Sequence, residues 1–233
     1  MIFVKFLMYF LKGSSVIAGI YFLNNNPKDK TTQFFVGFLM LNFLVVITSY
    51  LPRIIEFNAS LNHLQNTFLN NDYWLYNPFI LIGYSIYAWY FRMGLRSKLR
   101  KRIILLGIIS INIVGYAHLY YEGIFFNAHS KLIFLLGFLL IVTSISFYYY
   151  ELLKSDQVLA INKSVKMYIS IGYLFYNLLC MPVWIYSHKY YNHLNPKFGE
   201  LYSFTISLAH ILIYSIYIFA FIYCARKYKP ITT

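Results

Sequence analysis

Long apolar runs separated by short polar connections dominate this sequence. A helix needs about 20 apolar residues to cross a hydrocarbon core of about 30 Å. Seven windows are long enough, at roughly residues 3–23, 33–52, 73–91, 103–121, 132–152, 167–187 and 203–225. Backbone amides in lipid must be hydrogen-bonded within their own segment, and the runs lack the alternation of a transmembrane strand. The pattern predicts an all-α polytopic membrane protein with seven transmembrane helices in one domain, residues 1–233.

The first window is the weakest, because Lys5 and Lys12 interrupt its apolar run. A cleaved signal peptide is the alternative for this segment. Such a peptide ends in a small-residue cleavage site that precedes a soluble region, and the sequence shows neither. We therefore expect a transmembrane helix at 3–23. If this helix were removed, the other six would keep the same directions.

The composition agrees with a membrane protein. Hydrophobic residues make up 60% of the chain, charged residues only 12%, and the mean hydropathy is +0.57. Soluble domains have about 25% charged residues, and disordered chains are far less apolar. The two cysteines, Cys180 and Cys224, lie near opposite ends of their apolar runs, so we expect no disulfide between them.

The charge balance predicts the orientation. Twenty Lys and Arg against seven Asp and Glu give a net charge of +13, but the basic residues lie between apolar runs, where they set topology and meet lipid headgroups rather than nucleic acid. One set of alternate connections holds fourteen of them and the other six. The positive-inside rule then places the N-terminus outside and the C-terminus inside a bacterial inner (cytoplasmic) membrane. The strongest determinants are Arg96, Lys98, Arg100, Lys101 and Arg102.

The longest connection, 53–72, carries apolar residues at steps of three and four. These residues are Ile54, Phe57, Leu61, Leu64 and Phe68. This spacing predicts a short amphipathic helix on the outer surface of the membrane. Aromatic residues also collect near the predicted helix ends, as at interfaces between hydrocarbon and headgroups, and they include Trp74, Trp89 and Trp184.

All six histidines fall in the outer half of this topology, namely His63, His118, His129, His188, His193 and His210. Histidine suits proton sensing or metal binding, although polar loops hold polar residues in any case. No pair has the spacing of a helical metal site, and we expect no metal. His210 lies inside an apolar run, where an ionisable group is costly. With His118 and Asn177 it forms our candidate pocket, and interhelical hydrogen bonding is the alternative role.

The sequence lacks the residues that several known membrane-protein activities require. The window 203–225 has no lysine for retinal, and the chain has no histidine cluster, no glycine-rich phosphate loop and no mid-helix carboxylate for proton coupling. We therefore expect no enzymatic activity and no cofactor.

Four local phrases carry a resemblance: YWLYN at 73–77, FYYYELL at 147–153, ISIGYLFY at 169–176 and AHIL at 209–212. In these the chain resembles an uncharacterised family of small seven-helix integral membrane proteins of the Bacteroidota. Some members resemble input modules associated with sensor histidine kinases. The resemblance implies a sensory role, and no catalytic residues transfer from it.

The sequence thus predicts a non-enzymatic membrane protein of sensory or accessory type. It would have an outer-facing pocket, contacts with the lipid bilayer, and a signalling or membrane protein as partner, because the chain ends eight residues after its last window. A small transporter or channel would instead gather Asn42, Asn112 and Asn177 around one path. A structural subunit of a membrane complex would have no internal pocket.

Overall fold

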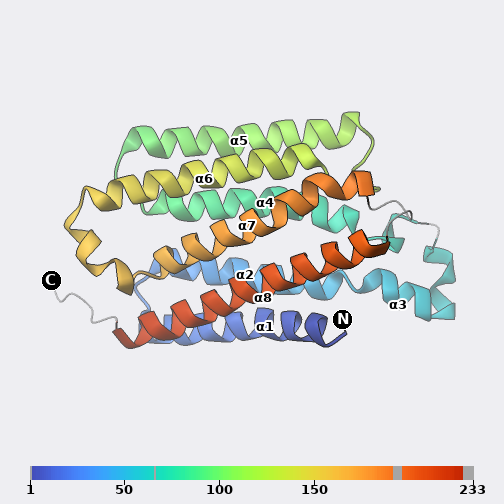
Figure 1. The fold of residues 1–233 in the computed structure, drawn as a ribbon, viewed down its shortest axis with the longest axis horizontal. Coiled ribbons are helices and arrows are strands. Elements are labelled where there is room, and N and C mark those ends of the chain that lie inside the picture. The colour runs from blue at the N-terminus through green and yellow to red at the C-terminus, as the bar shows by residue number, and fades with distance from the viewer. Residues whose placement is uncertain (1, 66, 191–195, 228–233) are drawn as a thin grey trace. The chain divides into compact units, whose positions relative to one another are not determined.

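The computed structural model describes residues 2–65, 67–190 and 196–227, and these residues form helices and connections without any strand. The α-helices in Figure 1 are α1 (Ile2–Asn25), α2 (Lys30–Thr48), α3 (Leu51–Phe57), α4 (Tyr73–Met93), α5 (Lys98–Tyr121), α6 (Lys131–Leu153), α7 (Val165–Tyr190) and α8 (Pro196–Lys227). Short 3₁₀ segments lie at Ala59–Leu64, Phe68–Asn70 and Asp156–Lys163. The all-α prediction is confirmed for these residues.

Six helical segments among the described residues are long and apolar enough to cross a membrane. They are Phe6–Asn25, Lys30–Phe57, Lys98–Tyr121, Lys131–Leu153, Val165–Tyr186 and Lys197–Arg226. The chain therefore has the helices of a multi-pass membrane protein. The predicted window 73–91 forms α4, which is not one of the six. Its five tyrosines and two tryptophans lower its hydropathy, because these side chains have polar tips.

Several boundaries differ from the predicted windows. The window 33–52 contains a break, because α2 ends at Thr48 and Pro52 lies in the first turn of α3. Proline is tolerated there but cannot continue a preceding helix. The basic run after Arg96 is also helical rather than a loop: α5 begins at Lys98, and the Ser97 side chain caps it.

The predicted amphipathic helix in the connection 53–72 is replaced by three short helical pieces. α3 ends at Phe57, and the backbone of Asn58, the next residue, is extended, with φ −112° and ψ 106°. The Asn58 side chain accepts a hydrogen bond from the Ser60 amide at 3.1 Å, which starts a new turn. Thr67 caps the last piece, Phe68–Asn70. The hydrogen bonds of the Asn58 and Thr67 side chains to nearby backbone amides thus replace the backbone hydrogen bonds of the continuous helix that the apolar spacing predicts.

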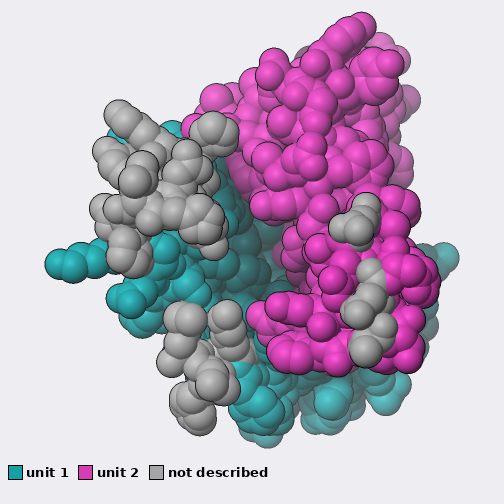
Figure 2. All heavy atoms as spheres, turned by 90° about the vertical axis from the view of Figure 1, so that its right-hand side faces the viewer, with its two compact units in different colours: residues 1–39, 148–233 teal, residues 40–147 magenta. Residues whose placement is uncertain are grey.

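The chain forms two compact units, coloured separately in Figure 2: unit 1 contains residues 1–39 and 148–233, and unit 2 contains residues 40–147. In unit 1, α8 packs along both α1 and α7. Aromatic rings fill this core. Phe35 of α2 meets Tyr217 of α8 edge-on with 5.4 Å between ring centroids, and Phe22 of α1 lies 6.1 Å from Phe221 of α8.

Unit 2 is built on close approaches between α4, α5 and α6. A Cβ atom on Gly137 of α6 would lie 2.3 Å from the Tyr84 ring of α4, and one on Gly115 of α5 would lie 2.6 Å from Leu81. Small residues let membrane helices approach closely where no hydrophobic force drives them together. A hydrogen bond of 2.7 Å from Asn112 Nδ2 of α5 to Ser85 Oγ of α4 adds a polar link.

This packing makes a testable prediction at Gly137. Gly137→Ala places a methyl group against the buried Tyr84 ring and should lower the free energy of unfolding by about 1–3 kcal/mol. The matched control is Gly37→Ala in α2, because nothing lies within 4 Å of a Cβ atom there. Thermal unfolding of the detergent-solubilised variants measures the difference. Equal midpoints for Gly137→Ala and wild type would show that the contact does not constrain the fold.

Candidate functional site

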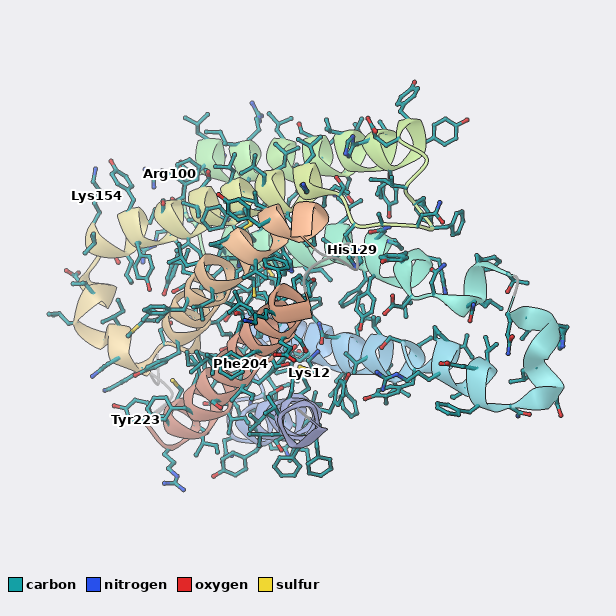
Figure 3. The ribbon with its side chains drawn as sticks, turned by 45° about the vertical axis from the view of Figure 1, so that its right-hand side comes forward. Lys12, Arg100, His129, Lys154, Phe204 and Tyr223 are labelled. Carbon is teal, nitrogen blue, oxygen red and sulfur yellow. The ribbon has the colours of Figure 1, made fainter. Side chains whose placement is uncertain are left out.

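A lysine lies inside the first apolar helix of unit 1. Lys12 is ten residues past the start of α1, about 15 Å along its axis. Only 7% of the residue is exposed. Its side chain extends toward α8, where Nζ lies 5.6 Å from the centroid of the Tyr214 ring (Figure 3). The ring face offers this ammonium group a partial negative charge, which compensates a small part of its lost hydration.

His210 lies four residues before Tyr214 on α8, so both side chains occupy the same face of the helix. Their rings stack with 6.2 Å between centroids and 17° between planes. His210 Nδ1 lies 2.7 Å from the Ile206 carbonyl oxygen, which can only accept, so Nδ1 donates this bond. In a neutral imidazole Nε2 is then the acceptor, and it lies 3.4 Å from the Tyr176 hydroxyl of α7.

Asn177 of α7 is also buried, with 1% of the residue exposed. Its Nδ2 donates a hydrogen bond of 2.8 Å to the Tyr173 carbonyl oxygen, one turn earlier. Its Oδ1 is buried and accepts no hydrogen bond from any described residue. A buried acceptor without a donor costs about 1–3 kcal/mol. Asn177 therefore has an unused acceptor in the interior of unit 1.

We call one group of side chains the polar layer: Lys12, Tyr176, His210 and Tyr214, which are linked by ring contacts, and Asn177, which interacts with Tyr173, a neighbour of Tyr214. It lies near the middle of three packed helices, α1, α7 and α8. Lys12 Nζ makes no ion pair or hydrogen bond within the part of the chain that the structure describes, and its electrostatic neighbour is His210. The layer therefore has one cationic side chain and no acid to pair with it. It can bind an anionic group or exchange a proton.

The three residues of the predicted pocket fall in both units, and the pocket stays a prediction. Asn177 and His210 both belong to unit 1 and to the polar layer, whereas His118 lies on α5 in unit 2. Lys12 was not predicted as a pocket residue, because a lysine in the first window was interpreted as an interruption of the helix and a determinant of topology. Its position in the middle of an apolar run could have indicated a buried cation. His193 and the side chains of Lys5 and His188 lie outside the described residues.

Another predicted outer histidine, His129, holds a connection in place. Its Nδ1 lies 3.0 Å from Asn77 Oδ1 of α4. Asn77 Nδ2 in turn donates to the carbonyl oxygens of Phe125 and Ala128, at 2.7 and 3.0 Å. Asn77 thereby fixes the connection between α5 and α6 on the start of α4. Burial lowers the pKa of His129 to about 4. Among the described residues, no group of three or more His, Cys, Asp or Glu could hold a metal ion.

Comparison of the chain with protein-family models, with curated proteins and with solved structures gives no match. The resemblance to the seven-helix family of the Bacteroidota thus stays a prediction.

The environment of His129 predicts a pH dependence. The neutral ring is favoured in the folded state, because the pKa of His129 is lowered from 6.5 to about 4. The unfolded chain binds a proton below about pH 6.5, so stability should fall by up to about 3 kcal/mol as the pH drops from 6.5 to 4. Hydrogen exchange of residues 122–130 at pH 7.5, 5.5 and 4.5 measures this effect.

The control for this prediction is His129→Gln, which keeps a donor for Asn77 Oδ1 but does not titrate. Two ring hydroxyls, those of Tyr73 and Tyr76, and the Asp72 carboxyl are the neighbouring titratable groups on the α4 side. Burial raises the pKa of Asp72, which favours the folded state at low pH and opposes the effect of His129. If wild type and His129→Gln open equally at every pH, His129 does not control the connection.

Proposed function

We propose that the protein is a non-enzymatic multi-pass membrane protein of sensory or accessory type. Its polar layer recognises a small ligand, a proton or a lipid, and a separate signalling or membrane protein carries the output. The observation that carries this proposal is the burial of Lys12 beside His210 without an acidic partner among the described residues. Ionisable groups inside membrane helices are rare and mark binding or transfer sites, because burying their charge costs several kcal/mol.

The proposed topology has seven crossings, with the N-terminus outside and the C-terminus inside a bacterial inner membrane. The 21 residues of α4 extend about 31 Å, enough to cross the hydrocarbon core. In unit 1, contacts support the proposal that three segments with basic residues lie at the same end: the connection between α1 and α2, the start of α7 and the end of α8. Asp29, between α1 and α2, attracts Lys166 at the start of α7, and Tyr168 packs on Tyr223 near the end of α8. The positive-inside rule makes this end cytoplasmic.

The proposed partner contacts the basic connections on the cytoplasmic side. Unit 2 contributes the run from Arg96 to Arg102, of which Lys98 and Arg102 are exposed. Lys154, at the end of α6, is an exposed cation of unit 1. Such a surface suits an acidic region of a signalling protein close to the membrane.

A transporter or channel has weaker support. It would gather Asn42, Asn112 and Asn177 around one path, but Asn112 and Asn177 each donate to a carbonyl oxygen of their own helix. Asn112 already donates both to Ser85 and to the Ile108 carbonyl oxygen. These bonds give Asn112 a role in joining α4 and α5. A purely structural subunit is not favoured by any observation on the described residues. The buried Lys12 charge lowers the stability of the fold and forms no hydrogen bond or ion pair there that would offset this loss.

The first test is the stability of Lys12→Met. If Lys12 serves recognition, its removal relieves an uncompensated buried charge and should raise the free energy of unfolding by about 2–3 kcal/mol. The matched control is Lys154→Met, because Lys154 also lies over a tyrosine ring, 4.3 Å from the centroid of Tyr150, but is exposed. Thermal unfolding in detergent measures both variants. A lower midpoint for Lys12→Met would make Lys12 a structural residue.

Lys12→Met also tests the signalling role. Tagged wild type, Lys12→Met, His210→Ala and Lys131→Met are crosslinked in the native cell and purified, and the recovered partner is quantified by mass spectrometry. We expect recovery to change at least threefold for Lys12→Met and His210→Ala and to stay at the wild-type level for Lys131→Met, because Lys131 is an exposed lysine at the start of α6 and outside the proposed contact surface. Equal recovery from all four proteins, or no reproducible partner, would overturn the proposal.

A further inference from the structure

An open groove lies where α2 turns into α3. It has a volume of about 480 Å³, and its lining residues, all in unit 2, are Tyr50, Arg53, Ile54, Phe57 and Asn58. We call it the α3 groove. The groove lies at the junction of the two helices, because α2 ends at Thr48 and α3 begins at Leu51, with Pro52 in its first turn. The groove contains none of the residues of the polar layer.

The groove has one charged side chain, Arg53. Its guanidinium carbon lies 5.5 Å from the centroid of the Tyr50 ring, which holds the group over the groove. Arg53 is exposed and makes no ion pair or hydrogen bond with any described residue. Even Glu56, one turn away on α3 and also exposed, does not pair with it. The planar fork of N–H donors on Arg53 is therefore open, and this fork matches the oxygens of a phosphate group.

The rest of the lining is apolar and exposed. Ile54 is 54% exposed and Phe57 is 86% exposed. The last turns of α2 continue this surface, with Leu44 59% exposed and Ile47 53% exposed. A contiguous apolar surface of this kind on a transmembrane helix fits hydrocarbon chains, so the groove joins a lipid-facing surface to a cation.

Aromatic residues place this region at the boundary between hydrocarbon and headgroups. α3 packs on the segment Phe68–Asn70. Phe68 meets Trp74, at the start of α4, with 6.0 Å between ring centroids, and it lies 5.7 Å from Phe126. Tryptophan and other aromatic rings gather at this depth of a bilayer. The groove therefore lies where phospholipid phosphates are found.

We propose that the α3 groove binds the headgroup of an anionic phospholipid. The Arg53 guanidinium pairs with the phosphate, Asn58 offers a donor to the headgroup, and Ile54 and Phe57 lie along the first part of the acyl chain. The anionic class fits better than a zwitterionic one, because no acidic side chain lines the groove to pair with a headgroup ammonium. The bound lipid would fix the angle between α2 and α3.

The test uses the full chain in mixed micelles with phosphatidylglycerol or with phosphatidylcholine of the same acyl chains, and native mass spectrometry counts the lipids retained. Wild type should retain phosphatidylglycerol preferentially, and Arg53→Gln should weaken this retention roughly tenfold, with Arg53→Lys in between because an ammonium lacks the planar fork. The matched control is Glu56→Gln, an exposed position on the same helix outside the lining, which should retain the lipid as wild type does.

A second measurement locates the lipid. A phosphatidylglycerol probe with a photoreactive acyl chain should label the segment 50–58 of wild type and lose this labelling in Arg53→Gln, while thermal unfolding confirms that the variant is folded. Equal retention by wild type and Arg53→Gln overturns the proposal. Labelling confined to other segments, or a protein crosslinked at 50–58 in place of the lipid, also overturns it.

Discussion

The requirement that every backbone amide be hydrogen-bonded in hydrocarbon determines this structure. It makes each apolar run a helix, and it also governs the polar side chains inside those helices. Several of them donate to a carbonyl oxygen one turn earlier: Thr48 to Leu44, Ser85 to Leu81, Asn112 to Ile108, Thr143 to Leu139 and Ser144 to Leu140. Each of these donors is thereby satisfied within its own helix. Polar residues can therefore occupy membrane helices without any binding role.

Against this background, two buried groups of unit 1 are exceptional. The Lys12 ammonium has no carbonyl, carboxylate or hydroxyl partner among the described residues, and Asn177 Oδ1 has no donor. A hydroxyl or an amide N–H can donate a hydrogen bond to a carbonyl oxygen of its own helix. A lysine side chain is too long to fold back on its own turn. An amide oxygen needs a hydrogen-bond donor, and the backbone N–H groups of the helix are already used. Both groups thus depend on something beyond their own helix, which is why the polar layer, rather than the Asn112 link, is the candidate for recognition.

The sequence predicted the helices well, because hydrophobic length alone determines them. Each predicted window overlaps a helix, but the window 33–52 is divided between α2 and α3, and α4 is not one of the six candidate membrane spans. It predicted the helix ends less well, since the breaks at Asn58 and Pro52 depend on single side chains that outweigh the apolar spacing. It proposed Asn177 and His210 as pocket residues and did not propose Lys12. Which helices pack together is set by contacts far apart in the chain, such as that between Lys12 and Tyr214, and periodicity carries no information about them.

The two sites differ in the way they hold charge, and this difference assigns their roles. Arg53 is exposed, so its charge costs little, and in our proposal a lipid phosphate from the bilayer satisfies it. Lys12 is buried, so its charge is costly unless an anion arrives or the proton leaves. A site that is always occupied can stabilise a fold but cannot report a change. A site whose energy depends on an external anion or proton can report one, and we propose the polar layer as that site.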